Sequence, residues 1–198
     1  MNKQEEDEIF GKLVLVASAA LPEMFSARNY CLNGTRVLID VLQHFGIEAK
    51  PLSVQLVVTN AAWKECLDKV GVATQAMVDE WVESKGAWSV GIDTSSPKEP
   101  GLWNGHIVLV TDRVLVDSAI GQLSRPEKNM KLPGAFACEY APEFFSKGRA
   151  LSIVGPKGVW VRYWAREKDK SFEQLPGFQR SQTNQEVTEE IIELMSKL

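Results

Sequence analysis

The sequence predicts a protein of the α+β class. In residues 1–85 most apolar residues recur at helical spacing. Residues 88–166 instead hold short runs rich in β-branched residues, separated by turn-forming residues. Helices followed by antiparallel strands are typical of this class. With 198 residues and no long linker or internal repeat, residues 1–198 are expected to form a single domain with a substantial core.

Two helices are predicted at the start of the chain. The first covers residues 5–20 and is closed by Pro22, because proline interrupts a helix. The second begins near residues 29–31 and stops at Gly46. Its apolar residues recur at helical spacing and are Val37, Leu38, Val41, Leu42 and Phe45.

A strand and further helical sequence follow. The strand is indicated by period-two alternation of Leu52, Val54, Leu56 and Val58. Residues 60–84 are expected to form one or two helices broken at Gly71, and a short apolar run follows at residues 88–92. Residues 93–101 have the composition of a loop.

The last third of the chain predicts a hairpin and a final helix. Residues 149–154 and 159–166 flank the turn sequence GPKG, which indicates a hairpin. Thr183 and Glu186 have capping-box spacing and lead into a helix over about residues 184–198. The residues expected on its apolar face are Val187, Ile191, Leu194, Met195 and Leu198.

Composition and charge exclude several classes of protein. Hydrophobic residues make up 44% and charged residues 24%, which excludes an intrinsically disordered chain. The net charge is −4, the isoelectric point is near 5.4 and no stripe of Lys and Arg recurs, so no nucleic-acid partner is expected. The apolar run at residues 13–21 follows four acidic residues and is too short to span a bilayer. Neither a secretory signal nor a membrane partner is therefore predicted.

The cysteines are few and scattered. Cys31, Cys66 and Cys138 form an odd set without a CxxC pair, which predicts neither a disulfide framework nor a metal site. No GxGxxG or Walker A motif is present, so no cofactor is expected. A reducing cytoplasm is the simplest location for such a chain.

The strand pair at residues 105–117 places two polar side chains together. Its sequence, GHIVLVTDRVLVD, is expected to form a hairpin around Thr111 and Asp112. His106 would then lie directly opposite Asp117, with Cβ atoms ~5 Å apart on one face. The carboxylate could fix the imidazole tautomer and stabilise an imidazolium. A slip of one residue would place the two side chains on opposite faces.

Cys31 is predicted at or near the start of the second helix. The unpaired N–H groups and positive dipole end of a helix favour a thiolate over a thiol. The same N–H groups can hold the oxyanion of a tetrahedral intermediate. Together with a histidine, this position predicts a cysteine nucleophile.

These segments resemble a known family. CLNGTRVLIDVLQHFGIEAKPLSVQLVV and NGHIVLVTDRVLVDSA are similar to the core of the transglutaminase-like, papain-like cysteine superfamily. Its members include transglutaminases, bacterial cysteine proteases and amidases, and arylamine N-acetyltransferases. The shared pattern is a Cys at a helix start, a Gly-Ile turn into a strand, a His on a later strand and an Asp on the next. Residues 42–49 match the turn, and the resemblance covers about residues 26–122.

The resemblance implies a fold and a chemistry. The fold would be papain-like/transglutaminase-like, with N-terminal helices packed on an antiparallel sheet and a core over about residues 26–166. Cys31 would be the nucleophile, His106 the base and Asp117 the residue that orients it. The expected activity is that of a cysteine hydrolase or acyltransferase acting on a peptide, amide or ester substrate. The missing cofactor motifs favour hydrolysis slightly.

Several other residues are candidates for substrate binding or for a different role. Tyr30, Trp103, Asn104 and Gln122 are the candidate substrate-binding residues, although packing is an alternative role for both aromatic residues. Residues 125–128 could form the rim of the cleft. Cys66 and Cys138 are expected to be structural. The competing hypothesis is a catalytically inactive scaffold, whose binding surface would be Trp160, Arg162 and Trp164 on one strand face.

Overall fold

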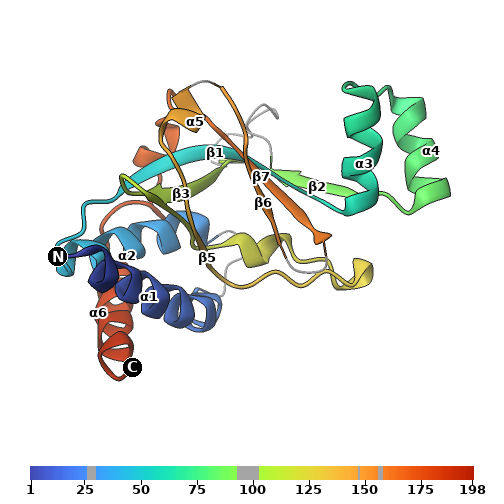
Figure 1. The fold of residues 1–198 in the computed structure, drawn as a ribbon. Coiled ribbons are helices and arrows are strands. Elements are labelled where there is room, and N and C mark those ends of the chain that lie inside the picture. Colours follow the sequence, from blue (N-terminus) through green and yellow to red (C-terminus); the bar gives the residue numbers. More distant parts are fainter. Residues whose placement is uncertain (26–29, 93–102, 147, 156–157) are drawn as a thin grey trace.

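The computed structural model describes residues 1–25, 30–92, 103–146, 148–155 and 158–198 and confirms the mixed α+β class. Its centre is a seven-stranded antiparallel sheet in the order β5-β4-β3-β1-β7-β6, with β2 also paired to β1 (Figure 1). The strands are β1 (Lys50–Thr59), β2 (Ser89–Ile92), β3 (His106–Val110), β4 (Val114–Asp117), β5 (Phe136–Glu139), β6 (Leu151–Val154) and β7 (Trp160–Ala165).

Three of the helices pack on one face of the sheet, and two others form a hairpin beyond one end of it. They are α1 (Lys3–Met24), α2 (Cys31–His44), α3 (Ala61–Val70), α4 (Gln75–Lys85), α5 (Glu143–Ser146) and α6 (Gln182–Ser196). α1, α2 and α6 lie together, while α3 and α4 project from the far ends of β1 and β2 (Figure 1). None of the helices in these residues is long and apolar enough to cross a membrane.

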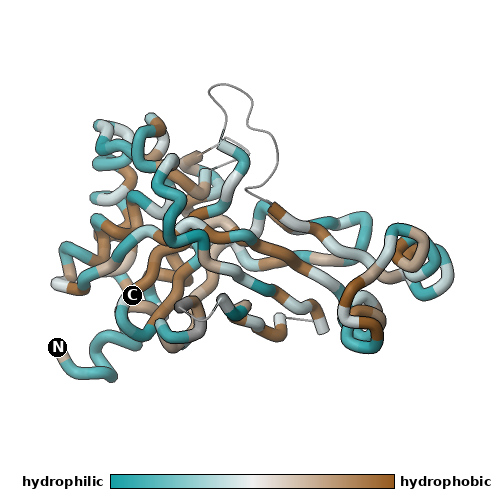
Figure 2. Tube along the Cα trace, turned by 90° about the horizontal axis from the view of Figure 1, so that it is seen from above, coloured by the Kyte–Doolittle hydropathy of each residue, from teal (hydrophilic) through white to brown (hydrophobic). Residues whose placement is uncertain are grey.

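Both faces of the sheet carry a hydrophobic core. Ile107 and Leu109 of β3 pack with the helices α1, α2 and α6. Val108, between them, packs on the other face with the apolar residues of β1, β7 and the segment that follows β4. Apolar residues accordingly follow the central strands in Figure 2. Burial on both faces explains why β3 is an unbroken apolar run rather than an alternating one.

The structure corrects the predicted end of the first helix. α1 continues through Pro22 to Met24. A proline near the C-terminus of a helix removes one hydrogen bond, and the ladder resumes because the Phe25 N–H donates to Leu21 O at 3.0 Å. The Ser18 side chain, one turn earlier, accepts from and donates to the Ala135 backbone, which holds this turn against the chain before β5.

The structure also corrects the predicted last helix. Its N-cap is Ser181, whose Oγ accepts from the Asn184 N–H at 3.1 Å, and not Thr183. Asn184 is buried and hydrogen-bonded to Asn33 of α2, a tertiary contact that fixes where the helix begins. Leu198, expected on the apolar face, lies beyond the helix and is 58% exposed.

Other elements agree with the sequence in part. α3 and α4 are separate helices, with Gly71 at φ +71° at the end of α3. β6 and β7 pair as the predicted hairpin, although part of the predicted turn, residues 156–157, lies outside the described residues, as does the predicted loop from residue 93. β5, which pairs with β4 along its whole length, was not predicted.

Gly34 allows α2 to approach the end of β4 closely. A Cβ added at Gly34 would lie 2.8 Å from Ser118 Oγ and 3.1 Å from Ser118 Cβ. Gly34→Ala gains helix propensity but meets this contact, so we expect a net loss of about 1–2 kcal/mol in the free energy of unfolding, measured by urea denaturation.

Gly11 in α1 provides the matched control, because a Cβ there meets nothing within 4 Å. Gly11→Ala should stabilise the protein by about 0.5–1 kcal/mol. Equal effects of the two substitutions would contradict the close approach of α2 to Ser118.

Candidate active site

Cys31 is the first residue of α2 and is 4% exposed. The N-cap residue, Tyr30, makes no side-chain hydrogen bond to the helix. The Tyr30 side chain therefore leaves the first-turn N–H groups of α2 uncapped. α2 is anchored to the sheet by Thr35, whose hydroxyl donates to Ile107 O at 3.3 Å and lies 3.3 Å from Ser118 Oγ. These contacts hold the start of α2 against the ends of β3 and β4.

His106 and Asp117 form a direct contact, as the sequence predicted. His106 Nε2 lies 2.9 Å from Asp117 Oδ2, and both side chains are fully buried. The predicted register, however, is wrong by two residues. Leu109 pairs with Val116 instead of Val114, so His106 and Asp117 face each other diagonally. A shift of two residues keeps both side chains on one face, which is why the contact survives.

Thr111 explains the shift in register. Its hydroxyl accepts from the N–H groups of Arg113 and Val114, at 3.3 and 3.0 Å, and its own N–H donates to Val114 O. Thr111 was expected to be one of the two loop residues. Instead it pairs with Val114 across the turn, and its hydroxyl hydrogen-bonds to the turn backbone, as Ser and Thr hydroxyls often do. Arg113 is released to form ion pairs with Glu6 and Asp7 of α1.

Asp117 is held by three donors. Besides the imidazole, the Tyr163 hydroxyl donates to Oδ2 at 3.0 Å and the Ala119 N–H donates to Oδ1 at 2.9 Å. Tyr163 lies in β7 and is fully buried. Burial and the charge of Asp117 raise the pKa of Tyr163 well above its usual value, so its hydroxyl stays a donor.

Sequence reasoning missed Tyr163, although the sequence held a signal for it. In β7 the half-buried Trp160, Arg162 and Trp164 alternate with buried residues, which places Tyr163 on the inner face. A buried tyrosine hydroxyl requires a hydrogen-bond partner. The alternation could thus have pointed to a polar group near Tyr163, but not to which one.

The imidazole of His106 is charged at neutral pH. Burial lowers its pKa, but the charge and hydrogen bond of Asp117, with a smaller contribution from Cys31, raise the pKa to about 10. Since Asp117 occupies Nε2, Nδ1 is the nitrogen left for the thiol. Nδ1 is buried and has no partner of ordinary hydrogen-bond geometry in the described part of the chain. The thiol therefore interacts with the ring without being aligned on Nδ1, as is common before a substrate binds.

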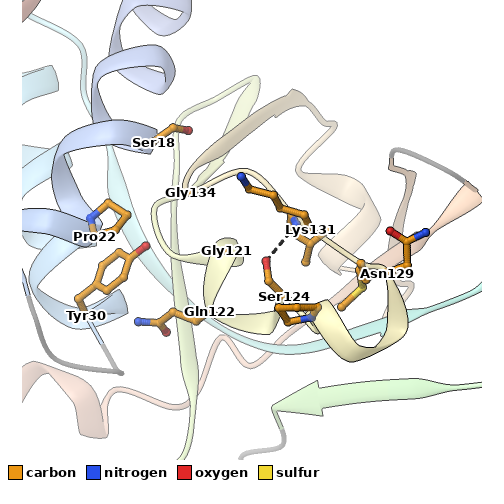
Figure 3. Close-up of a pocket in the computed structure, with 12 residues that line it drawn as sticks. Ser18, Pro22, Tyr30, Gly121, Gln122, Ser124, Asn129, Lys131 and Gly134 are labelled. Carbon is orange, nitrogen blue, oxygen red and sulfur yellow. Dashed lines mark hydrogen bonds between the residues drawn. The ribbon is translucent and has the colours of Figure 1, made fainter.

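Two of the predicted substrate-binding residues lie on one cavity. Tyr30 and Gln122 both line it, and Figure 3 shows the Gln122 amide turned toward Tyr30. Burial and the charges of Asp117 and Cys31 raise the pKa of Tyr30 to about 12. The ring of Tyr30 is therefore electrostatically coupled to both groups.

Trp103 and Asn104 are placed differently. Trp103 is half-buried, with its ring 6.0 Å from that of Phe172, and its Nε1 is buried without a partner among the described residues. Packing therefore accounts for its ring. Asn104 is exposed, and neither residue lines the cavity beside Tyr30. Of the predicted rim, residues 125–128, only Pro126 does so.

The other two cysteines lie apart from this arrangement. Burial and the charge of Asp117 raise the pKa of Cys138, on β5, to about 12, so this thiol stays protonated. Cys66 is buried in α3, with Lys85 Nζ 3.6 Å from its sulfur. All three cysteines are free. Among the described residues no group of three His, Cys, Asp or Glu side chains could hold a metal ion.

Comparisons with known proteins give no match: none was found among protein-family models, curated proteins or solved structures. The class of protein must therefore be argued from the geometry of Cys31, His106 and Asp117. That geometry combines a thiol at a helix start with a charged, buried imidazole that a carboxylate holds from its far side. Such an arrangement can form a thiolate–imidazolium pair.

The Tyr163 hydroxyl should contribute to stability through Asp117. Tyr163→Phe leaves Asp117 Oδ2 with one donor fewer in a buried site, and we expect a loss of about 1–3 kcal/mol in the free energy of unfolding. Tyr140→Phe is the matched control, since its hydroxyl donates to Thr111 O at 2.9 Å in a less buried place. A smaller loss in the Tyr163 variant than in the Tyr140 variant would contradict the role given to Tyr163.

The raised pKa of His106 predicts how stability depends on pH. A pKa that folding raises from 6.5 to about 10 stabilises the fold fully below pH 6.5, and this contribution is lost as the pH rises through 10. From pH 6 to pH 9 the wild type should lose on the order of 2–3 kcal/mol more than His106→Gln, which cannot titrate there. Urea denaturation at both pH values measures this, and parallel losses would contradict it.

Proposed function

We propose that the chain is a cysteine enzyme with a papain-like/transglutaminase-like fold that acts on an amide or ester carbonyl through an acyl-enzyme. One observation carries the proposal. The buried His106 ring is held by Asp117 at Nε2, its Nδ1 has no hydrogen-bond partner in the described residues, and Cys31 is close enough to the ring to raise the pKa of His106. The helix start at Cys31, the paired strands of His106 and Asp117 and the family resemblance of these segments support it.

The chemistry starts from a thiolate–imidazolium pair, in which the proton of the Cys31 thiol already resides on His106 Nδ1. The Cys31 thiolate then attacks the carbonyl carbon, and the backbone N–H of Cys31 holds the oxyanion. As the intermediate collapses, Nδ1 returns its proton to the leaving amine or alcohol and a thioester forms on Cys31. Asp117 keeps the ring oriented throughout.

The second half of the reaction depends on the acceptor. His106 removes a proton from water, which attacks the thioester and releases the acid, or from an amine, which gives acyl transfer. The substrate is thus a peptide, amide or ester, and we favour water as the acceptor. Free thiols at all three cysteines suit a reducing cytoplasm, which we propose as the location.

A catalytically inactive scaffold is the second candidate function. Trp160, Arg162 and Trp164 are half-buried on one face of β7, and the ammonium of Lys64 lies 4.5 Å from the Trp160 ring. An aromatic surface with cations is suited to binding. A scaffold would keep its binding after Cys31→Ser or His106→Ala, whereas an enzyme would lose turnover with either change.

Alkylation by iodoacetamide distinguishes the two candidates. Each cysteine is followed by peptide mass mapping between pH 5 and pH 9, in the wild type and in His106→Ala. We expect Cys31 alone to react below pH 7, because the imidazolium favours its thiolate, and to react at least about tenfold more slowly in His106→Ala.

The other histidine and the other cysteines serve as controls. His44→Ala changes a residue at the opposite end of α2 and should leave the rate at Cys31 unchanged. Cys138, with a pKa raised to about 12, should not react in this range. The triad is refuted if Cys31 in the wild type reacts no faster than Cys66 and Cys138.

A further inference from the structure

A cavity lies between the residue that precedes Cys31 and the segment that follows Asp117. One wall is formed by Ser18 and Pro22 of α1 and by Tyr30, the residue before Cys31. The other is formed by residues 121–134, which follow Asp117 (Figure 3). The volume is about 630 Å³, within the range of about 300–1,000 Å³ that is typical of small-ligand sites. Tyr30 directly precedes Cys31 in the chain, and the far wall begins four residues after Asp117, so both walls continue from segments that carry the reacting groups.

The shape of the cavity is fixed by close backbone contacts. A Cβ added at Gly134 would lie 2.3 Å from Ser18 O, and one added at Gly121 would lie 2.9 Å from Pro133 O. The Leu132 N–H donates to Ser124 Oγ at 3.0 Å, which ties two parts of the far wall together (Figure 3). The cavity is therefore preformed rather than dependent on a ligand to shape it.

The lining is largely apolar, with a small number of polar groups. Pro22, Met130, Leu132 and the ring of Tyr30 supply apolar surface. Gln122 supplies an amide whose Nε2 is buried and has no acceptor in the described residues. A buried N–H without an acceptor is unfavourable, and a bound carbonyl oxygen would satisfy it.

The charge of the lining limits the ligand further. Among the described residues that line the cavity, Lys131 is the one charged side chain, and none of these residues is acidic. A cationic ligand would meet no counter-charge there, whereas a neutral group or a carboxylate would be tolerated beside the ammonium.

We infer that this cavity binds the apolar part of the substrate, an aliphatic or aromatic acyl compound that is neutral or anionic and whose carbonyl oxygen accepts from Gln122 Nε2. This inference rests on the proposed function, because only an enzyme would have a substrate to place in the cavity. Binding itself requires no turnover, so it can be tested separately.

Three ligands with one branched carbon chain test the inference: isocaproamide, isocaproate and isohexylamine. They are titrated into Cys31→Ala protein labelled with ¹³C at the methionine methyl groups. Met130 lines the cavity, and the methyl groups of Met1, Met24, Met77 and Met195 report binding elsewhere. Isocaproamide and isocaproate should shift Met130 saturably, while isohexylamine should bind at least about tenfold more weakly.

Two variants locate the binding. Gln122→Leu removes the donor with little change in volume and should weaken isocaproamide about tenfold, whereas Gln174→Leu, the same change at an exposed site in the 3₁₀ turn Ser171–Gln174, should not. Lys131→Ala should weaken isocaproate and leave isocaproamide unchanged. Gln122→Leu and Lys131→Ala leave the apolar wall of the cavity unchanged, so both are expected to fold. Thermal melting checks this.

The outcomes separate this inference from the proposed function. No saturable shift at Met130, equal binding of isohexylamine, or the same affinity in the Gln122 and Gln174 variants would each overturn the cavity assignment, even if Cys31 proves reactive. Saturable, Gln122-dependent binding would uphold it even if Cys31 proves inert to iodoacetamide and the catalytic proposal fails.

Discussion

The interaction between His106 and Asp117 sets the strongest constraint on this structure, because it places an imidazolium and a carboxylate where water cannot reach them. Burial of charge is costly unless every charged group is paired and hydrogen-bonded. Asp117 meets that condition with the imidazole, the Tyr163 hydroxyl and the Ala119 N–H. If one of these three donors is removed, the other two keep their own hydrogen bonds and leave a buried lone pair of Asp117 without a donor.

The sheet order brings the donors of Asp117 together. His106 is on β3, Asp117 on β4 and Tyr163 on β7, so these hydrogen bonds join strands from both sides of β1. β1 fills the space between them, pairing with β3 on one side and β7 on the other. α2 joins this frame through Gly34 and Thr35, which bring Cys31 to the imidazole. The position of the Cys31 thiol is thus set by contacts that other residues of α2 make with the sheet.

The sequence predicted the contacts that depend on local patterns. The start of α2 at Cys31 and the shared face of His106 and Asp117 follow from periodicity, which tolerates a register error of two residues. Features set by tertiary contacts were not predictable. The shift at Thr111 comes with a local side-chain hydrogen bond that hydrophobic periodicity does not encode, and it comes with ion pairs between Arg113 and α1. The helix capped by Ser181 is held to α2 through Asn184. Tyr163 was missed because its partner lies 46 positions away.

Stability alone gives little reason for a buried charged pair at this position. Replacing both members of such a pair with well-packed apolar residues is often neutral or stabilising, while removing one member is strongly destabilising. The strands of His106 and Asp117 carry residues of both cores, Ile107 and Val116 in one and Val108 and Leu115 in the other. What an apolar pair cannot provide is a proton donor and acceptor next to the Cys31 thiol. A scaffold has no use for that property, whereas acyl transfer through a thioester requires it. The energetic cost of the pair therefore favours the catalytic interpretation of this site over the scaffold.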